Sequence, residues 1–96
     1  MKKSQFHTHN AYTLSNANHT IFYSYNTPIL IVANLTGGAV KCGQWFSSST
    51  TRQLNRYIKE NNLNPTTQND PAIFRALMSG VFDLYPEMPR HLGLLR

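Results

Sequence analysis

The first half of the chain alternates between apolar and polar residues in the way that is typical of β-strands. The pattern covers Tyr12–Leu14, Ile21–Asn26 and Ile29–Asn34, and the turn-forming run Ser15–Asn18 separates the first two segments. Pro28 interrupts the pattern and indicates an edge position, a bend or a bulge. We therefore expect three or four strands between residues 11 and 46.

A glycine pair, Gly37–Gly38, suits a two-residue hairpin turn with positive φ. That turn would pair Leu35 with Val40 and would divide the hairpin into two faces. The face expected in the core is almost purely apolar and holds Ile29, Ile31, Ala33, Leu35, Val40, Cys42 and Phe46. The opposite face is mixed and is expected to be partly exposed, which could support a homodimer; it holds Leu30, Val32, Asn34, Lys41, Gly43 and Trp45.

The second half of the chain has helical periodicity. A serine- and threonine-rich cap predicts a helix over residues 48–62, and Asp70–Pro71 predicts the start of another over residues 70–85. The apolar positions of the second helix fall in one arc: Ile73, Phe74, Leu77, Met78, Val81, Leu84 and Tyr85. Strands followed by helices predict an α+β fold, with an antiparallel sheet in the N-terminal half and two helices packed on one face.

Length and composition indicate one domain spanning residues 1–96. Residues 1–10 read as a flexible basic arm containing histidines, and residues 86–96 as a tail. The apolar run Ile29–Ala33 is far shorter than a membrane span, and no apolar stretch of a signal peptide follows the first residues. Cys42 is the single cysteine, which fits a reducing compartment, so a cytoplasmic protein without membrane contact is expected.

An excess of basic residues points to acidic partners. Nine Lys/Arg against four Asp/Glu give a formal charge of +5, although only 14% of the residues are charged. Three cations, Arg52, Arg56 and Lys59, line one face of the first predicted helix, opposite Leu54 and Tyr57. We predict that this stripe binds a phosphate or an acidic protein, with Lys41, Ser49, Thr50 and Thr51 assisting and with Trp45, Tyr23 and Tyr25 as aromatic contacts. The alternative is that the hydroxyls only cap the helix and that the stripe is a solvated face.

Catalytic and metal chemistry receive little support from the sequence. His7, His9, His19 and Cys42 lack the spacing of a structural zinc site, so no metal or other cofactor is expected. No carboxylate pair or phosphate-cradling glycine loop is present, and Cys42 falls on the predicted buried face. We therefore expect no enzymatic activity; the alternative is a small enzyme or metal protein that uses these histidines or Cys42.

Two segments carry a resemblance: Phe22–Ile29, and Trp45–Asn55 with its Ser-x-Thr-Thr helix start. Over residues 12–60 the chain resembles small uncharacterised proteins of bacteriophages and mobile elements. The resemblance implies an accessory protein in the cytoplasm of a bacterial host. It would bind a host protein or ribonucleoprotein complex that handles nucleic acid, as anti-CRISPR and other anti-defence inhibitors do. The alternative is direct binding of DNA or RNA, whose affinity should fall by about 10³-fold between 50 and 200 mM salt if six or more phosphates are contacted.

Overall fold

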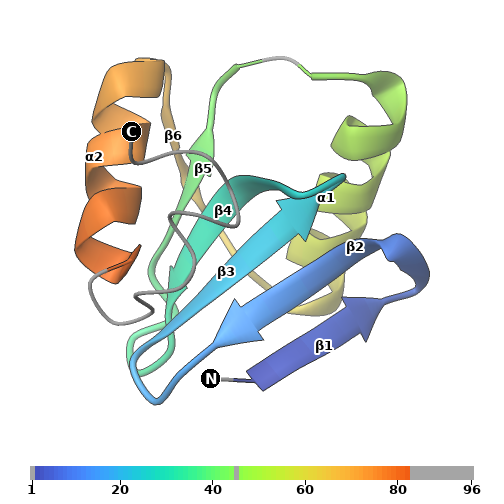
Figure 1. Ribbon diagram of the computed structural model, residues 1–96, viewed down its shortest axis with the longest axis horizontal. Helices are drawn as coiled ribbons and strands as arrows, with labels where there is room; N and C mark the ends of the chain where they lie inside the picture. Colours follow the sequence, from blue (N-terminus) through green and yellow to red (C-terminus); the bar gives the residue numbers. More distant parts are fainter. Residues whose placement is uncertain (1, 45, 83–96) are drawn as a thin grey trace.

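The computed structural model describes residues 2–44 and 46–82, which form a mixed six-stranded sheet and two helices (Figure 1). The strands lie in the sheet in chain order. They are β1 (Lys2–Phe6), β2 (Thr8–Ser15), β3 (His19–Ser24), β4 (Thr27–Ala33), β5 (Ala39–Cys42) and β6 (Thr66–Gln68). The helices are α1 (Ser48–Glu60), which connects β5 to β6, and α2 (Pro71–Phe82). All neighbouring pairs are antiparallel except β5 and β6, which are parallel.

The α+β class is confirmed, but the expectation of three or four antiparallel strands is wrong. Residues 2–10, expected as a flexible arm, form β1 and the beginning of β2. A further strand, β6, comes between the two helices in the sequence and pairs in parallel with β5 at the edge of the sheet. Both missed strands are edge strands with mostly exposed polar residues, so they carry no apolar alternation that could mark them in the sequence.

The two helices cover opposite faces of the sheet, not one face as expected (Figure 1). On the α2 face, Phe74 and Met78 pack on sheet residues that include Ile21 and Tyr23. The α1 face buries a second cluster: Ala11, Phe22, Ile29, Leu30, Val32 and Ala39, with Leu54 and Tyr57 packed against it. Leu30 and Val32 are therefore core residues. The half-exposed surface that was expected to support a homodimer is covered by the chain's own helix.

The β4–β5 hairpin differs from its predicted register by four residues. Val40 pairs with Ile31 instead of Leu35, and Leu35 lies in the connecting loop with 91% of its surface exposed. Because a shift of four residues is even, Ile31 and Val40 still share the face that was predicted for them. Ile29 changes face, since a bulge opposite Phe22 places it in the same cluster as Leu30. The irregularity indicated by Pro28 is thus a bulge, and it lies within the sheet and not at its edge.

The two-residue hairpin with positive φ occurs between β3 and β4. Ser24 pairs with Thr27, and the two residues between them, Tyr25 and Asn26, have φ values of 52° and 64°. Two consecutive left-handed residues characterise the type I′ turn, which matches the twist of the strands that it joins. The first position holds a tyrosine, although asparagine, aspartate or glycine adopts this backbone at lower cost.

Both ends of α1 and the start of α2 are capped by side chains or backbone. Ser47 accepts a hydrogen bond from the backbone N–H of Thr50, as an N-cap does. Asn62, with φ of 53°, ends α1 in a Schellman arrangement in which the Leu63 N–H donates to the Ile58 carbonyl at 3.0 Å. Asp70 caps α2 as predicted, since its side chain accepts from the backbone N–H of Ala72.

Within α2, Phe74 and Met78 are buried, whereas Ile73 and Leu77 are 47% and 44% exposed. The predicted apolar arc is thus only partly used in the described core. Leu84, Tyr85 and the tail over residues 86–96 lie outside the described residues. Neither helix of the described chain is long and apolar enough to span a bilayer.

Gly43 marks a close approach between the end of β5 and the segment after β6. Its N–H donates to the Gln68 carbonyl at 2.8 Å, and a β-carbon there would overlap Oδ1 of Asn69 and lie 3.0 Å from its α-carbon. We expect Gly43→Ala to lower the free energy of unfolding by about 1–3 kcal/mol through overpacking. Urea denaturation of Gly43→Ala, Asn69→Ala and the double variant would measure this effect. A coupling energy near zero in that cycle would contradict the overlap.

Candidate functional site

Four of the predicted site residues line one groove. It lies between the outer side of α1, the β1–β2 connection and the β3–β4 turn, and has a volume of about 320 Å³. Its walls combine cations, aromatic rings, hydroxyls and amides. They are Phe6, His7, Thr8, Asn10, Tyr25, Ser49, Arg52, Gln53 and Arg56. We call this the basic groove.

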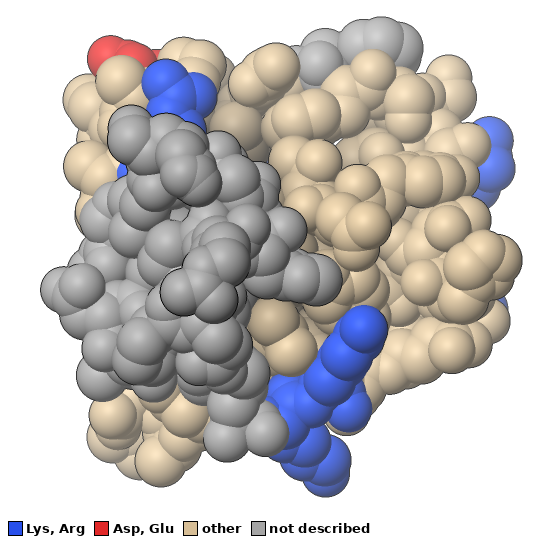
Figure 2. Space-filling model, in the orientation of Figure 1, with Lys and Arg blue, Asp and Glu red and all other residues tan. Residues whose placement is uncertain are grey.

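Two arginines give the basic groove its charge. Arg52 and Arg56 are exposed and follow each other after about one turn of α1, so both side chains reach the same side of the helix. On the face shown in Figure 2, some Lys and Arg atoms gather at the lower edge and others lie apart at the upper left and the right edge, while most of the coloured surface carries no charge. The pairing of two arginines in a hollow is therefore a local feature and does not follow from a uniformly basic surface.

Tyr25 is held at the rim of the basic groove by the turn that contains it. Its backbone N–H donates to the Asn10 carbonyl at 2.8 Å, and the side chain of the next residue, Asn26, accepts from the Tyr12 hydroxyl at 3.0 Å. The residue is nevertheless 51% exposed. The turn thus fixes the backbone of an aromatic residue and leaves much of its surface open to a partner.

The carboxylate of Glu60 contacts two residues that line the basic groove, His7 and Arg56. Glu60 accepts a hydrogen bond from Nε of Arg56 at 3.0 Å, and both of its oxygens lie within 3.1 Å of Nε2 of His7. Since a carboxylate oxygen only accepts, Nε2 of His7 carries a proton. The hydrogen bonds from His7 and then from Arg56 hold the pKa of Glu60 below its usual value of 4.5. Glu60 therefore offsets part of the positive charge and links the β1–β2 connection to α1.

This contact predicts a pH dependence with a definite sign. Because the pKa of Glu60 is lower in the folded state, its stabilising contribution is present above the unfolded-state pKa of about 4.5 and is lost as the pH falls through the folded value. An NMR titration of the Glu60 side-chain carboxyl should show a midpoint below 4.5. In His7→Ala that midpoint should rise, because the first of the two hydrogen bonds that lower it is lost. An unchanged midpoint in His7→Ala would contradict the His7–Glu60 contact.

Two predicted contact residues, Thr50 and Tyr23, are inaccessible to a partner because they are buried. The hydroxyl of Thr50 faces that of Ser24 at 2.9 Å, and Ser24 in turn donates to Oε1 of Gln53 at 2.5 Å. Thr50 is only 6% exposed, so its hydroxyl fastens α1 to β3 instead of facing a partner. Tyr23 is fully buried and stacks on Tyr12 with ring centroids 4.9 Å apart. Neither residue can form the surface contact that was predicted for it.

The remaining predicted residues lie elsewhere. Lys41 and Thr51 line a separate hollow between β5 and α1, together with Cys42 and Asn55. Lys59 is exposed on α1 but does not line the basic groove. Trp45 lies outside the described residues. Nothing in the sequence marks further residues that contribute to the site, because their strand and helix positions carry no distinguishing pattern: Phe6, Thr8, Asn10, Gln53 and Glu60.

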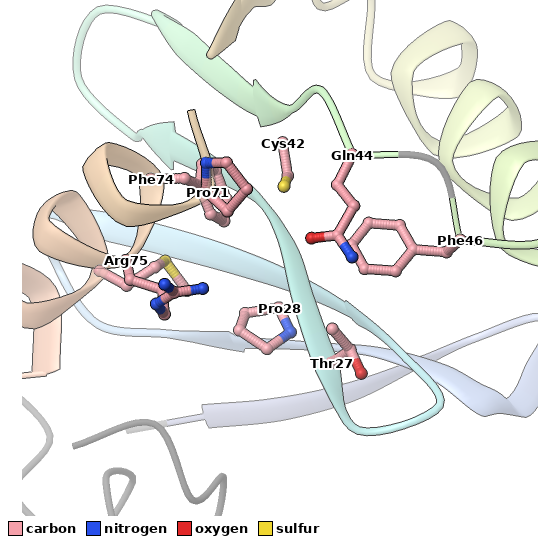
Figure 3. A pocket seen from close by; sticks show the side chains of 9 residues that line it. Thr27, Pro28, Cys42, Gln44, Phe46, Pro71, Phe74 and Arg75 are labelled. Atoms are coloured by element: carbon pink, nitrogen blue, oxygen red, sulfur yellow. The ribbon is translucent and has the colours of Figure 1, made fainter. Parts of the chain in front are cut away.

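A smaller crevice opens on the α2 side, between β4, the segment after β5 and α2 (Figure 3). Its lining is mainly apolar and includes Pro28, Cys42, Phe46 and Phe74, while the Arg75 side chain reaches toward it from α2. The volume of about 80 Å³ is well below the roughly 300 Å³ at which pockets for small organic ligands begin. The basic groove is therefore the better candidate site.

The histidines and the cysteine are distributed over separate elements. His7 is turned by its left-handed backbone (φ 64°) toward Glu60, His19 lies on β3 and Cys42 lies at the end of β5. Among the residues that the structure describes, no group of three or more His, Cys, Asp or Glu side chains comes together. What the basic groove offers chemically is hydrogen bonding, positive charge and an aromatic surface.

Comparison with known proteins places the chain in a family. The model of one family matches residues 1–72 of the 96. The chain belongs to DUF8033, a family of unknown function. The DUF8033 match spans all six strands and α1 and ends in the first turn of α2, so the whole basic groove falls inside it. No curated protein and no solved structure matches the chain.

Proposed function

We propose that this DUF8033 protein acts without catalysis, by stoichiometric binding to an anionic surface of nucleic-acid-handling machinery. The observation that carries the proposal is the basic groove, where Arg52 and Arg56 lie beside Tyr25 and Ser49. Arginine binds carboxylates and phosphates through a planar fork of donors, and tyrosine adds apolar contact area. Proteins that bind partners concentrate such residues at the contact.

The contacts of Glu60 and His7, the carboxylate and the imidazole at the groove, favour a binding role and not a catalytic one. The carboxylate of Glu60 is bonded to His7 and Arg56 at 3.0 Å each. A general acid or base must meet the proton that it transfers within hydrogen-bond reach, with a pKa near the working pH. The lowered pKa of Glu60 keeps this carboxylate ionised at neutral pH, where it is a weak base. The arrangement suits a fixed charge pattern.

The resemblance to small phage and mobile-element proteins suggests which partners to test first. Accessory proteins of that kind bind host complexes, and the resemblance favours a host ribonucleoprotein in the bacterial cytoplasm. A CRISPR or other defence complex would combine acidic protein surfaces with exposed nucleic acid. Both would be attracted by the two arginines of the basic groove.

Charge reversal in the basic groove tests the proposal. Arg52→Glu combined with Arg56→Glu should reduce capture of the partner by at least about tenfold, because two attractive charges become repulsive in a partly enclosed site. The measurement is quantitative mass spectrometry of proteins and nucleic acid retained from a host lysate by the tagged variants. Circular dichroism and the thermal midpoint should show an intact fold, since both side chains are exposed.

A control with the same change in net charge separates the groove from general basicity. Lys2→Glu with Lys59→Glu alters two exposed residues that do not line the groove. It should retain most of the captured partner. Equal capture by the wild type and the Arg52/Arg56 variant would show that the arginines are only a solvated face. Equal losses in both double variants would show that overall charge, and not the groove, governs retention.

A further inference from the structure

We propose that the occupant of the basic groove is a segment of single-stranded nucleic acid, with its phosphates against Arg52 and Arg56 and a base on the ring of Tyr25. This inference rests on the function proposed above and names the part of the partner that enters the site. It follows from three features of the groove: the pair of arginines, the exposed tyrosine and the polar groups between them.

The arginines suit phosphate. A guanidinium group presents five N–H donors in one plane and matches the oxygens of a phosphate in a two-bond contact. Arg56 uses its Nε–H for Glu60 at 3.0 Å, and this contact orients the plane of the group. Arg52 precedes Arg56 by four residues, or about 6 Å along the helix axis. Two guanidinium groups at that spacing can contact a phosphate each along one strand.

The tyrosine distinguishes nucleic acid from an acidic peptide. A carboxylate gains little from an aromatic face, whereas every base offers a flat surface for stacking. Tyr25 is 51% exposed, and hydrogen bonds at Tyr25 and at Asn26 hold its turn in place. Its left-handed backbone, with φ of 52°, would be less strained with asparagine or glycine. A costly aromatic residue held open beside two arginines is the combination that single-strand binders use.

The polar wall explains why the strand must be single. Thr8, Asn10, Ser49 and Gln53 line the groove, and Oε1 of Gln53 is already held by Ser24. The amide nitrogen of Gln53 thus remains as a donor for the edge of a base. In a duplex the base faces are stacked and their pairing edges are used, so neither Tyr25 nor these groups could reach them.

Glu60 limits the affinity of the site. Its carboxylate bonds to both His7 and Arg56, which line the groove, and repels an incoming phosphate. Glu60→Gln keeps the size of the side chain and removes this charge, so it should tighten binding several-fold. With two phosphates contacted, the affinity of a single strand should fall by only about sevenfold between 50 and 200 mM salt. That shallow dependence separates the groove from a broad phosphate-coating surface.

The test measures fluorescence anisotropy of a labelled twelve-nucleotide oligothymidylate, a duplex of the same length and poly-L-glutamate at 50 mM salt. The wild type should bind the single strand more tightly than the other two probes. Tyr25→Ala should weaken single-strand binding by about tenfold, as expected for the loss of one stacked base, whereas Tyr25→Phe should retain it. Tyr25→Asn should also weaken binding, while its thermal midpoint should be at least that of the wild type because the turn is relieved.

Four outcomes would overturn the inference. The first is that Tyr25→Ala and the wild type bind the single strand with equal affinity, and the second is that the duplex binds as tightly as the single strand. The third is that poly-L-glutamate binds more tightly than the single strand, and the fourth is that the single strand does not bind at 50 mM salt. If partner capture still depends on Arg52 and Arg56, the proposed function survives and an acidic protein segment occupies the groove. If Arg52→Glu with Arg56→Glu changes neither capture nor binding of any probe, the proposed function fails as well.

Discussion

Replacing Phe74 and Met78 together by alanine should lower the free energy of unfolding by about 5 kcal/mol or more. Each side chain is almost fully buried, at 3% and 0% exposure, and large-to-alanine changes in a core cost about 2–5 kcal/mol apiece. Total stability for a domain of this size is about 5–15 kcal/mol, so the variant should be largely unfolded or close to it. Urea denaturation followed by far-ultraviolet circular dichroism measures the loss.

The same helix supplies matched controls for this prediction. Ile73 and Leu77 are apolar residues of α2 that are nearly half exposed. Their replacement by alanine removes much less buried surface and should cost less than half as much. If the two double variants lost equal stability, α2 would not bury Phe74 and Met78 selectively against the sheet. A loss below about 2 kcal/mol for Phe74→Ala with Met78→Ala would likewise contradict a second core on this face.

Phe22→Ala should cost about 3–5 kcal/mol, the largest loss expected from one substitution on the α1 face. Phe22 is fully buried and stacks on Tyr57 with centroids 4.5 Å apart, while Phe6 meets it edge-on at 5.5 Å. The three rings connect β1, β3 and α1, so alanine would leave a cavity where these elements meet. Equilibrium unfolding in guanidinium chloride would measure the loss.

A conservative variant separates ring contacts from simple burial at this position. Phe22→Leu keeps most of the apolar volume and should lose only part of the stability, including about 0.5–1.5 kcal/mol from each aromatic pair. Because Phe6 also lines the basic groove, Phe22→Ala should weaken partner binding through displacement of β1. Stability within 1 kcal/mol of the wild type would show that the three-ring cluster is not part of a packed core.

The sequence predicted those elements whose apolar residues face a core. Alternation located β2, β3 and β4, and helical spacing located α1 and the start of α2 within a few residues. β1 and β6 were not predicted, because an exposed edge strand made of residues such as Lys2, Lys3 or Thr67 shows no alternation of apolar and polar positions. The packing of a helix on each face of the sheet was not predicted, because Lys41 gives one face of the β4–β5 hairpin a mixed polar and apolar character. Lys41 lines the hollow between β5 and α1, where the helix does not fully cover the strand.

The candidate site was predicted in part. Helical periodicity correctly placed Arg52 and Arg56 on the outer side of α1, since exposure of a charged stripe follows from the buried stripe opposite it. The location of Tyr25 beside them depends on a turn that contains no glycine and so lacked a recognisable signature. Thr50 was assigned to the surface because its hydroxyl suggested a cap. Burial against Ser24 depends on the packing of α1 on β3, which no local pattern encodes.

The chain-order arrangement of the strands has a consequence for how the protein is made. β1 to β5 are joined by short connections, so each hairpin can close as soon as its second strand leaves the ribosome. β6 can join only after α1 has been synthesised and has crossed the sheet, because its pairing with β5 is parallel. Pulse-labelled hydrogen exchange should therefore protect amides of β2–β4 before those of β6. The basic groove is lined by residues of β1, β2, the β3–β4 turn and α1. It would therefore form when α1 packs on the early strands, before β6 joins the sheet.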